Sequence, residues 1–492
     1  MSVVLAIDQS TSATKAVLFD AQGKVLDRAS RNHQQIYPQP GWVEHDANEI
    51  WNNVLEVIRE IAGRQKAILS RLACISITNQ RETVLVFDRA TGEPLHNAIV
   101  WQCRRGDPIC QRLREQGNEK LVRERTGLKI DTYFSASKLK WLVAEKPEVA
   151  ASLCSGEAVI GTIDTFLIHR FTGGKILATD FTNASRTLLF DIDRLRWAEQ
   201  LCSLFEVPLS ALPKVCESTA KFGETDANGI LPKPVPICGV MGDSQASLFA
   251  QRCYEPGMAK ATFGTGTSIL LNIGHKFRML EQSAVTALAW VLKEQPTYAY
   301  EGLINFSAAT IEWLKNQLQF IKSAAEVESL ARAVPDNGGV YLVPAFAGLS
   351  APYWSPDARA AIVGMTAHTR KEHVVRAALE SIAYQIRDVL DSMREGAAVK
   401  LSHLYADGGP TQNDFLMQFT ADITGVELQV SEFSEASAWG AAMNGLLGLG
   451  LYKSLDELAS LPREMKHFQP QMAGDQAEKN YSGWKQAVKR VL

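Results

Sequence analysis

The chain has 492 residues, of which 46% are hydrophobic and 21% are charged, and its formal net charge is −3. This length predicts roughly two or three domains, and the composition is that of a globular protein whose core needs no disulfide or structural metal. The small net charge and the absence of long Lys/Arg runs argue against a nucleic-acid surface.

The cysteines, the N-terminal residues and the apolar stretches indicate in which compartment the protein is located. The eight cysteines show no C-x-x-C motif, so we expect buried, reduced thiols in a cytoplasmic protein and no zinc or thioredoxin-like site. The N-terminus enters a strand-like run at once, which argues against a signal peptide. The apolar stretch 439–451 is short and is interrupted by Asn444 and several glycines, so we expect no membrane span.

The first segment alternates strands with turns. Residues 3–7, 16–19 and 24–29 are predicted strands, and the polar turn 8–12 separates the first two. This spacing predicts a β-hairpin. Apolar residues at helical spacing over 47–68 then predict one long helix.

Strands and helices alternate through the rest of the chain. Further strands are predicted at 73–77, 84–87, 159–162, 236–240, 340–343 and 404–406, and helices at 374–393 and 413–423. This alternation predicts an α/β fold. A break at 251–257 divides the chain into predicted domains of residues 1–250 and 251–492. Both halves begin with a strand, a small-residue turn and a strand, the second over 259–273, which indicates an internal duplication.

Two small-residue turns are candidate phosphate sites. In the first, residues 8–15, Asp8 is a candidate Mg²⁺ ligand and Lys15 can neutralise phosphate oxygens, although an ordinary hairpin turn fits equally well. The second, residues 264–268, lacks both the Walker A and the dinucleotide-binding spacing. Opposed turns from two domains can nevertheless grip a triphosphate between them.

Two polar segments follow predicted strands and carry acceptor chemistry. Asp243 lies where α/β sheets place their ligands, and its carboxylate can accept a proton from an attacking hydroxyl. The alternative is an aspartate that caps a helix beginning near residue 245. Arg81 and Glu82 can hold vicinal hydroxyls, since one donates and the other accepts hydrogen bonds. The alternative there is a surface ion pair.

A third polar segment, residues 407–413, precedes a predicted helix. Its glycines suit close backbone contact with a nucleotide. The alternative is a helix start that is capped by Asn413 or Thr411.

At this point the residues resemble a known family. The stretches 36–46, 77–83, 97–105, 180–186, 348–354, 360–365 and 373–380 are similar to those of glycerol kinases, within the FGGY carbohydrate kinases of the actin-like ATPase superfamily. The resemblance runs from Val4 to about Val488. It implies two actin-like ATPase (ribonuclease H-like) domains flanking an interdomain cleft. It also implies phosphorylation of a primary hydroxyl of glycerol, with ATP and Mg²⁺ as cofactors.

The resemblance further implies roles for individual residues. Asp8 resembles the metal-organising carboxylate, and Asp243 the general base. The implied substrate positions are Arg81, Glu82, Trp101, Tyr133, Asp243, Ser244 and Ser268. The implied positions for ATP are Thr11, Ser12, Lys15, Thr265, Gly266, Ala308, Glu312, Gly408, Gly409 and Asn413.

Four of these positions depart from the family's pattern. Ser244 and Ser268 stand where glycerol kinases usually carry Gln and Phe, and both changes shorten side chains in the implied substrate pocket. Two interpretations stay open: the pocket takes a four- or five-carbon polyol or sugar, or neighbours refill the space and glycerol remains the substrate. Ala308 and Glu312 replace a usual Gly and Gln, which leaves the nucleotide preference open.

Two other classes of protein are alternatives to a kinase, and each requires features that the sequence can be checked for. A non-catalytic actin-like ATPase would keep Asp8 and the glycine turns but lose the acceptor residues, which are present here. A nicotinamide oxidoreductase would need a dinucleotide fingerprint, which is missing. We expect a small-molecule substrate, no nucleic-acid or membrane partner, and leave open whether the chain forms a homodimer or homotetramer.

Overall fold

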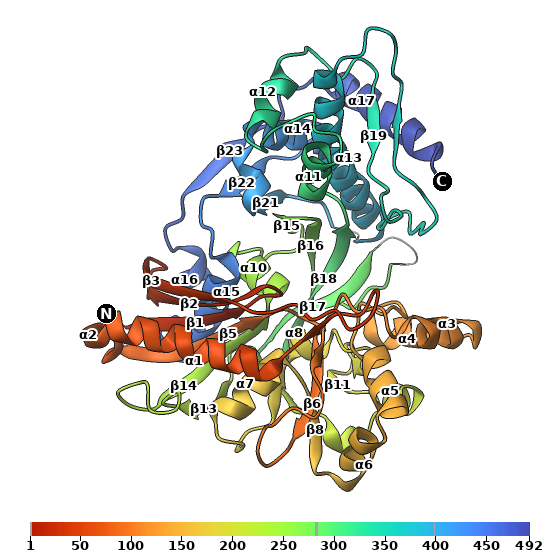
Figure 1. Cartoon of the computed structure of the whole chain (residues 1–492). Helices are drawn as coiled ribbons and strands as arrows, with labels where there is room; N and C mark the ends of the chain where they lie inside the picture. The colour runs from red at the N-terminus through yellow and green to blue at the C-terminus, as the bar shows by residue number, and fades with distance from the viewer. Residues whose placement is uncertain (1, 281–283, 398) are drawn as a thin grey trace.

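The computed structural model describes residues 2–280, 284–397 and 399–492, and two large mixed sheets organise it (Figure 1). The first sheet has six strands in the order β13 (Lys221–Thr225), β14 (Val235–Gly242), β5 (Leu72–Asn79), β1 (Val3–Gln9), β2 (Ala13–Asp20) and β3 (Val25–Asn32). The second has seven, in the order β17 (Val285–Leu292), β18 (Gln295–Ile304), β16 (Thr267–Gly274), β15 (Met258–Phe263), β21 (His403–Asp407), β22 (Leu428–Ser431) and β23 (Met465–Phe468).

The described residues also form four smaller sheets, one with four strands and three with two strands each. One has the order β4 (Glu44–His45), β7 (Ala98–Ile99), β6 (Val84–Asp88) and β8 (Ala158–Thr162). The two-stranded sheets pair β10 (Phe190–Asp191) with β11 (Arg196–Trp197), β12 (Lys214–Cys216) with β9 (Ala178–Asp180), and β19 (Tyr341–Val343) with β20 (Ala361–Val363).

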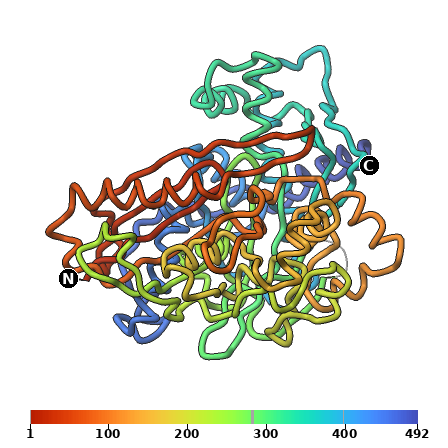
Figure 2. The backbone as a smooth tube through the Cα atoms, turned by 60° about the horizontal axis from the view of Figure 1, so that its bottom comes forward, coloured from red at the N-terminus to blue at the C-terminus, as the bar shows by residue number. Residues whose placement is uncertain are grey.

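Helices cover the sheets. In the segment that precedes β15 they are α1 (Ala47–Arg64), α2 (Lys66–Leu69), α3 (Asp107–Glu115), α4 (Glu119–Thr126), α5 (Ala136–Glu145), α6 (Pro147–Ser155), α7 (Ile163–Phe171), α8 (Phe181–Ala184), α9 (Glu199–Leu204) and α10 (Asp243–Ala250). After β18 they are α11 (Ala308–Asn316), α12 (Glu326–Arg332), α13 (Lys371–Ala397), α14 (Asp414–Thr424), α15 (Ala436–Gly448), α16 (Leu455–Ala459) and α17 (Gly474–Lys489). The two chain ends lie on opposite sides of the molecule in both views (Figure 1, Figure 2).

The two large sheets repeat one pattern, as the predicted duplication requires. β1 pairs antiparallel with β2 and parallel with β5, while β15 pairs antiparallel with β16 and parallel with β21. Both predicted hairpins are therefore confirmed. The predicted single helix over 47–68 is wrong, because the backbone leaves the helical region at Gln65 (φ −118°, ψ 28°) and α2 begins after it.

A helix from near the C-terminus completes the core of the first sheet. α15 packs on β14, β5 and β1, and its Trp439 lies 5.2 Å from Phe19 of β2 between ring centroids. Gly440 lets α15 approach α10 closely, since a Cβ there would lie 1.9 Å from the carbonyl oxygen of Ala246. The division at residues 250 and 251, which falls between α10 and β15, stays a prediction, and buried apolar contacts cross it.

Two expectations about special sites are tested in the described residues. All eight cysteines are free, but Cys154 is exposed and Cys216 is half-buried, so the prediction of uniformly buried thiols is wrong for these two. Within 2–280, 284–397 and 399–492 no cluster of three or more His, Cys, Asp or Glu side chains has the arrangement of a metal site. Among the helices described there, none combines the length and apolar character of a bilayer-spanning segment.

Gly408 joins the end of β21 to the turn after β15, and this contact gives the first prediction. Its φ is +101°, and a Cβ would lie 1.9 Å from the carbonyl oxygen of Phe263. We expect Gly408→Ala to lower the free energy of unfolding by about 1–3 kcal/mol, through backbone strain and displacement of that turn. Gly409→Ala is the matched control, because a Cβ at Gly409 meets nothing within 4 Å.

Thermal and denaturant unfolding of both variants measure the difference. Equal loss of stability in Gly408→Ala and Gly409→Ala would show that the close approach to Phe263 is unimportant.

Candidate active site

Three neighbouring strands of the first sheet deliver polar segments to one edge. β1, β5 and β14 run parallel, with Asp8 opposite Thr78 and Gly242 opposite Asn79. The segments that follow these strands therefore start from the same edge of the sheet. They carry Asp8, the pair Arg81–Glu82, and Asp243, so the structure brings together three groups that the sequence placed far apart.

Arg81 and Glu82 belong to a buried cluster of four charges. Arg81 Nη2 lies 2.7 Å from Glu301 Oε1, and Arg186 Nε lies 2.6 Å from Glu82 Oε1. Arg186 Nη1 also lies 2.5 Å from Glu301 Oε2. All four side chains are at most 3% exposed, so the alternative of a surface ion pair is wrong. Two cations and two carboxylates balance each other, which is the condition for burying charge.

The cluster also joins the two large sheets. Arg81 and Glu82 follow β5 of the first sheet, whereas Glu301 lies in β18 of the second. Burial raises the pKa of Glu301, but Arg186 and Arg81 outweigh burial and hold this pKa at about 2. Glu82 has a left-handed backbone (φ 62°), and Ser135 Oγ donates to its carbonyl oxygen over 2.8 Å. Backbone strain of this kind is typical of functional sites.

Several buried polar atoms beside this cluster have no hydrogen-bond partner among the described residues. They are Arg186 Nη1 and Nη2, Glu301 Oε2 and Ser268 Oγ. Arg186 Nη1 and Glu301 Oε2 lie 2.5 Å apart and form an ion pair with each other. Arg186 Nη2 and Ser268 Oγ are then left without a partner in the described chain, at a cost of about 1–3 kcal/mol for each such buried group.

Asp243 is the most open carboxylate of the group. Its side chain is 39% exposed, and its Oδ1 lies 3.2 Å from Arg81 Nε and accepts a hydrogen bond of 2.6 Å from the Ser244 amide. Asp243 is the first residue of α10, and Gly242 occupies the cap position without a side-chain bond. Asp243 is therefore not the N-cap residue of α10, although its carboxylate does accept from a first-turn amide. Arg81 holds one carboxylate oxygen while the side chain stays open to a hydroxyl.

Two aromatic residues form a wall beside this carboxylate cluster. The rings of Trp101 and Tyr133 lie 5.2 Å apart between centroids, and Trp101 Nε1 donates to Thr11 Oγ1 over 2.9 Å. Burial, and then the Glu82 carboxylate, raise the pKa of Tyr133, which keeps its hydroxyl protonated. The predicted substrate wall is thus bonded directly to the β1–β2 turn.

The β1–β2 turn holds Asp8 and Lys15 opposite each other in the hairpin register. Burial raises the pKa of Asp8 to about 7; Lys15 lowers it, while Asp243 and Glu435 raise it further. Among the described residues the Asp8 carboxylate accepts no hydrogen bond from the protein. Lys15 Nζ lies 3.7 Å from Glu435 Oε2. Ser12 is exposed at the tip of this turn.

The second turn, residues 264–268, packs on the start of α11. The amides of Ser307 and Ala309 donate to the Thr265 carbonyl oxygen over 2.9 and 3.1 Å, and the Ala308 amide donates to Gly264 over 3.1 Å. Gly266 and Gly408 complete the same edge through their close backbone contacts with Ile304 and Phe263. The structure therefore gathers the 264–268 turn, the start of α11 and the 407–413 loop.

Two predicted nucleotide positions have other partners. Asn413 Oδ1 accepts from the Leu416 amide over 2.9 Å, so the capping alternative is confirmed for this side chain. Thr411 Oγ1 instead donates to the Gly408 carbonyl oxygen over 2.7 Å. Glu312 accepts from Asn316 and lies 3.4 Å from Lys315 on its own helix, which directs its carboxylate to surface partners.

Sequence reasoning missed the charged residues that come from the second sheet. Lys260 of β15 is buried and donates to Thr262 Oγ1 over 2.8 Å; burial lowers its pKa against the opposing effect of Asp407. Asp407 accepts from Ser247 of α10 over 2.8 Å and from Gln251, the residue after this helix, over 3.0 Å. A charge inside an otherwise apolar strand, as at Lys260 and Glu301, was the available signal. Arg186 lay in a matched stretch but received no role.

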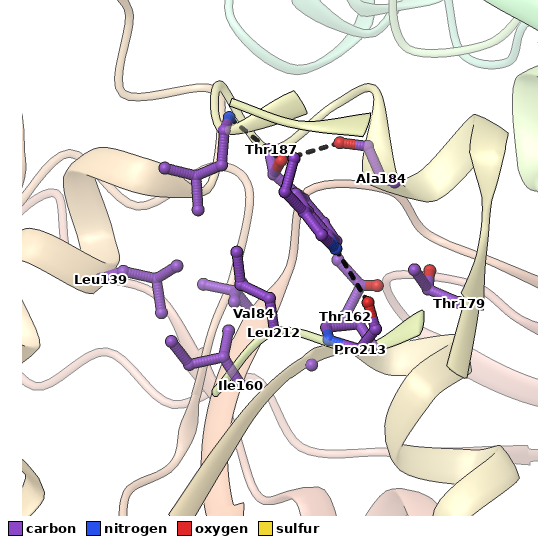
Figure 3. Close-up of a pocket in the computed structure, with 12 residues that line it drawn as sticks. Val84, Leu139, Ile160, Thr162, Thr179, Ala184, Thr187, Leu212 and Pro213 are labelled. Carbon is purple, nitrogen blue, oxygen red and sulfur yellow. Dashed lines mark hydrogen bonds between the residues drawn. The ribbon is translucent and has the colours of Figure 1, made fainter. Parts of the chain in front are cut away.

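A separate cavity lies inside the first part of the chain (Figure 3). Its volume is about 10 Å³, and its wall is apolar, with Val84, Leu139 and Ile160 on one side. The Thr187 hydroxyl beside it donates to the Ala184 carbonyl oxygen over 2.7 Å. The space holds about one water molecule, so this cavity is not a substrate site.

Comparisons with known proteins agree with this arrangement. The model of the FGGY family of carbohydrate kinases matches with its N-terminal domain at residues 3–250 and with its C-terminal domain at 259–449. A glycerol kinase of Desulfitobacterium hafniense is 45% identical over 489 residues, with 99% of each chain covered. Glycerol kinase 2 of Thermotoga maritima is 46% identical over 492 residues, covering 100% of this chain and 99% of the relative.

Solved structures support the fold. The crystal structure of Plasmodium falciparum glycerol kinase with ADP has a TM-score of 0.96 at 37% identity, covering 100% of this chain and 98% of that one. A ligand-bound xylulose kinase from Lactobacillus acidophilus has a TM-score of 0.87 at 22% identity, covering 98% and 96%, and shows likeness of fold alone. The predicted two-domain α/β fold of the actin-like ATPase type is confirmed. With both family domains matched along most of its length, the chain belongs to the FGGY family of carbohydrate kinases.

Proposed function

We propose that the protein transfers the γ-phosphoryl group of ATP to a primary hydroxyl of glycerol, giving glycerol 3-phosphate and ADP. The observation that carries this proposal is the open Asp243 carboxylate, which Arg81 holds at 3.2 Å beside the buried cluster of Arg81, Glu82, Arg186 and Glu301. The names of the relatives support glycerol as the acceptor. A non-catalytic ATPase would have no use for this acceptor cluster.

The residues present fit ATP and Mg²⁺. Asp8 is a half-buried carboxylate without a protein hydrogen bond in the described chain, and desolvation raises its pKa to about 7, so a cation beside it would offset an unfavourable charge. Bound Mg²⁺ would offset negative charge on the phosphates. Lys15, Thr11 and Ser12 would contact the phosphates from the first turn, and Thr265 with Gly266 from the second.

The proposed reaction needs little covalent chemistry from the protein. Arg81 donates to the acceptor hydroxyls and Glu82 accepts from them, while Trp101 and Tyr133 cover the carbon chain. The hydroxyl oxygen attacks the γ-phosphorus, the bond to the β–γ bridging oxygen breaks, and Asp243 receives the hydroxyl proton. Positioning and charge stabilisation account for the rate. Gly408, Gly409, Ala308, Glu312 and Asn413 stay proposed neighbours of the nucleoside.

One observation favours a second acceptor, a four- or five-carbon polyol or sugar. Ser268 pairs with Leu303, and Leu270 pairs with Glu301, so Ser268 and Glu301 lie on the same face of the second sheet. The Ser268 hydroxyl has no partner, and a substrate with a further hydroxyl would supply one. Ser244 adjoins Asp243 and leaves additional room. We also keep the cytoplasm as the proposed location, because eight free cysteines are typical of a reducing compartment.

The proton-accepting role of Asp243 gives a direct prediction. Asp243→Asn keeps the size of the side chain but removes the base, so we expect kcat to fall by about 10²–10⁴ while ADP affinity and the melting temperature stay unchanged. Asp414→Asn is the matched control, because Asp414 also begins a helix and is 43% exposed against 39% for Asp243. Steady-state kinetics that leave Asp243→Asn within about threefold of the parent enzyme would refute a general base at this position.

A kinetic panel decides between the two acceptors. Glycerol, erythritol and ribitol are compared by kcat/KM in the parent protein and in Ser268→Ala. If glycerol is the substrate, we expect it to have the highest kcat/KM of the three compounds, and Ser268→Ala to change the kcat/KM for glycerol by less than about threefold. If a longer polyol is the substrate, we expect that compound to have the highest kcat/KM, and loss of the Ser268 hydrogen bond to lower its kcat/KM by about 5-fold or more.

A third result would reject both acceptors. ATP hydrolysis that proceeds at the same rate with and without any polyol would favour a non-catalytic ATPase.

A further inference from the structure

A second cavity lies away from the residues of the proposed reaction. Its volume is about 560 Å³, within the range of about 300–1,000 Å³ of small-molecule sites. Four segments surround it: the β2–β3 turn at residues 22–25, the end of α10 at 250–252, the loop 431–436 before α15, and the loop 462–465 before β23. It therefore lies at the far end of β2 and of α10 from the 8–12 turn and from Asp243.

Arg252, in the wall of this cavity, is a buried cation without a counter-ion. It is 8% exposed, and its Nη1 donates to the carbonyl oxygens of Ala459 and Leu461 over 2.8 and 2.5 Å. Its Nη2 donates to Pro462 over 3.3 Å, but its Nε has no partner. No carboxylate of the described chain lies within ion-pair distance. Carbonyl dipoles satisfy hydrogens but do not cancel the full positive charge, so a compensating anion is favourable here.

A second arginine, Arg463, lines the same space and is exposed, so water already solvates its charge. Arg463 donates from Nη1 to the Gln251 carbonyl oxygen over 3.0 Å and from Nη2 to the Tyr405 hydroxyl over 3.1 Å, and its guanidinium lies 4.7 Å from the centre of that ring. It too forms no ion pair within the described residues. Burial and the nearby Arg463 lower the pKa of Arg252, which records the repulsion between the two cations.

The other residues that line this cavity form two groups, a charged group at its rim and an apolar group. Lys24, Glu432 and Glu464 are exposed, and neither glutamate reaches the arginines as an ion pair. Phe433, Trp439 and Met465 contribute the apolar part. Such a cavity is suited to a ligand with one strongly anionic group and an uncharged body.

We propose that this cavity binds a small organic phosphate, with its phosphate group beside the guanidinium groups of Arg463 and Arg252 and its body against Phe433 and Trp439. Arginine pairs favour phosphate over a simple halide because their planar N–H groups match its oxygens. The site does not include any residue of the proposed phosphoryl-transfer machinery. A nucleoside monophosphate and a sugar phosphate share the required chemistry.

Calorimetric titration of the ADP-saturated protein tests the proposal, since ADP occupies the proposed nucleotide site. Phenyl phosphate is the probe, and benzyl alcohol is its uncharged counterpart. We expect phenyl phosphate to bind saturably and benzyl alcohol not to bind. In Arg463→Met we expect the affinity for phenyl phosphate to fall about 10-fold or more. Lys466→Met is the matched control, since Lys466 is an exposed cation on β23 that pairs with Asp414 outside the cavity, and we expect its affinity within about twofold of the parent.

Two results of this titration would contradict the proposal. Binding of phenyl phosphate that is absent up to about 10 mM, or equally strong in the parent and Arg463→Met, overturns the site. Titrations with adenosine 5′-monophosphate and with glucose 6-phosphate then identify the source of the phosphate, because the tighter ligand shows whether an aromatic base or a sugar contacts Trp439.

Discussion

The arrangement of the proposed active site depends on one buried charge cluster. Arg81 and Glu82 come from the end of β5, Arg186 from the segment after α8, and Glu301 from β18 of the other large sheet. Removing one member would leave an uncompensated buried charge, at a cost of about 3–5 kcal/mol. The cluster therefore holds the two halves in register at the place where Arg81 contacts Asp243.

A second connection runs through α10. Its first residue is Asp243, and Ser247 of this helix and Gln251 just after it donate to Asp407, which immediately precedes Gly408. α15 packs against both α10 and the first sheet, so this short helix is enclosed by parts of both halves. The proposed base and the 407–413 loop are thus positioned by the same element, which links the acceptor side to the nucleotide side.

The structure also separates two uses of positive charge. Arg81 and Arg186 are neutralised by carboxylates in a site where the proposed substrate is uncharged. Arg252 and Arg463 are not neutralised, and they line a cavity large enough for a small metabolite. The same residue type therefore points to different chemistry in the two places, because the surrounding carboxylates differ.

The sequence by itself determined the fold class, both hairpins and the strand ends that carry Asp8, Arg81, Glu82 and Asp243, because apolar periodicity and polar turns are local signals. It also determined the family, through long matched stretches. Only the tertiary structure decided the partners of these residues. Glu301 reaches Arg81 from 220 positions away, and Asp407 reaches Gln251 from 156 positions away. Such pairings depend on sheet register and on which helix covers which face, and no local pattern encodes them.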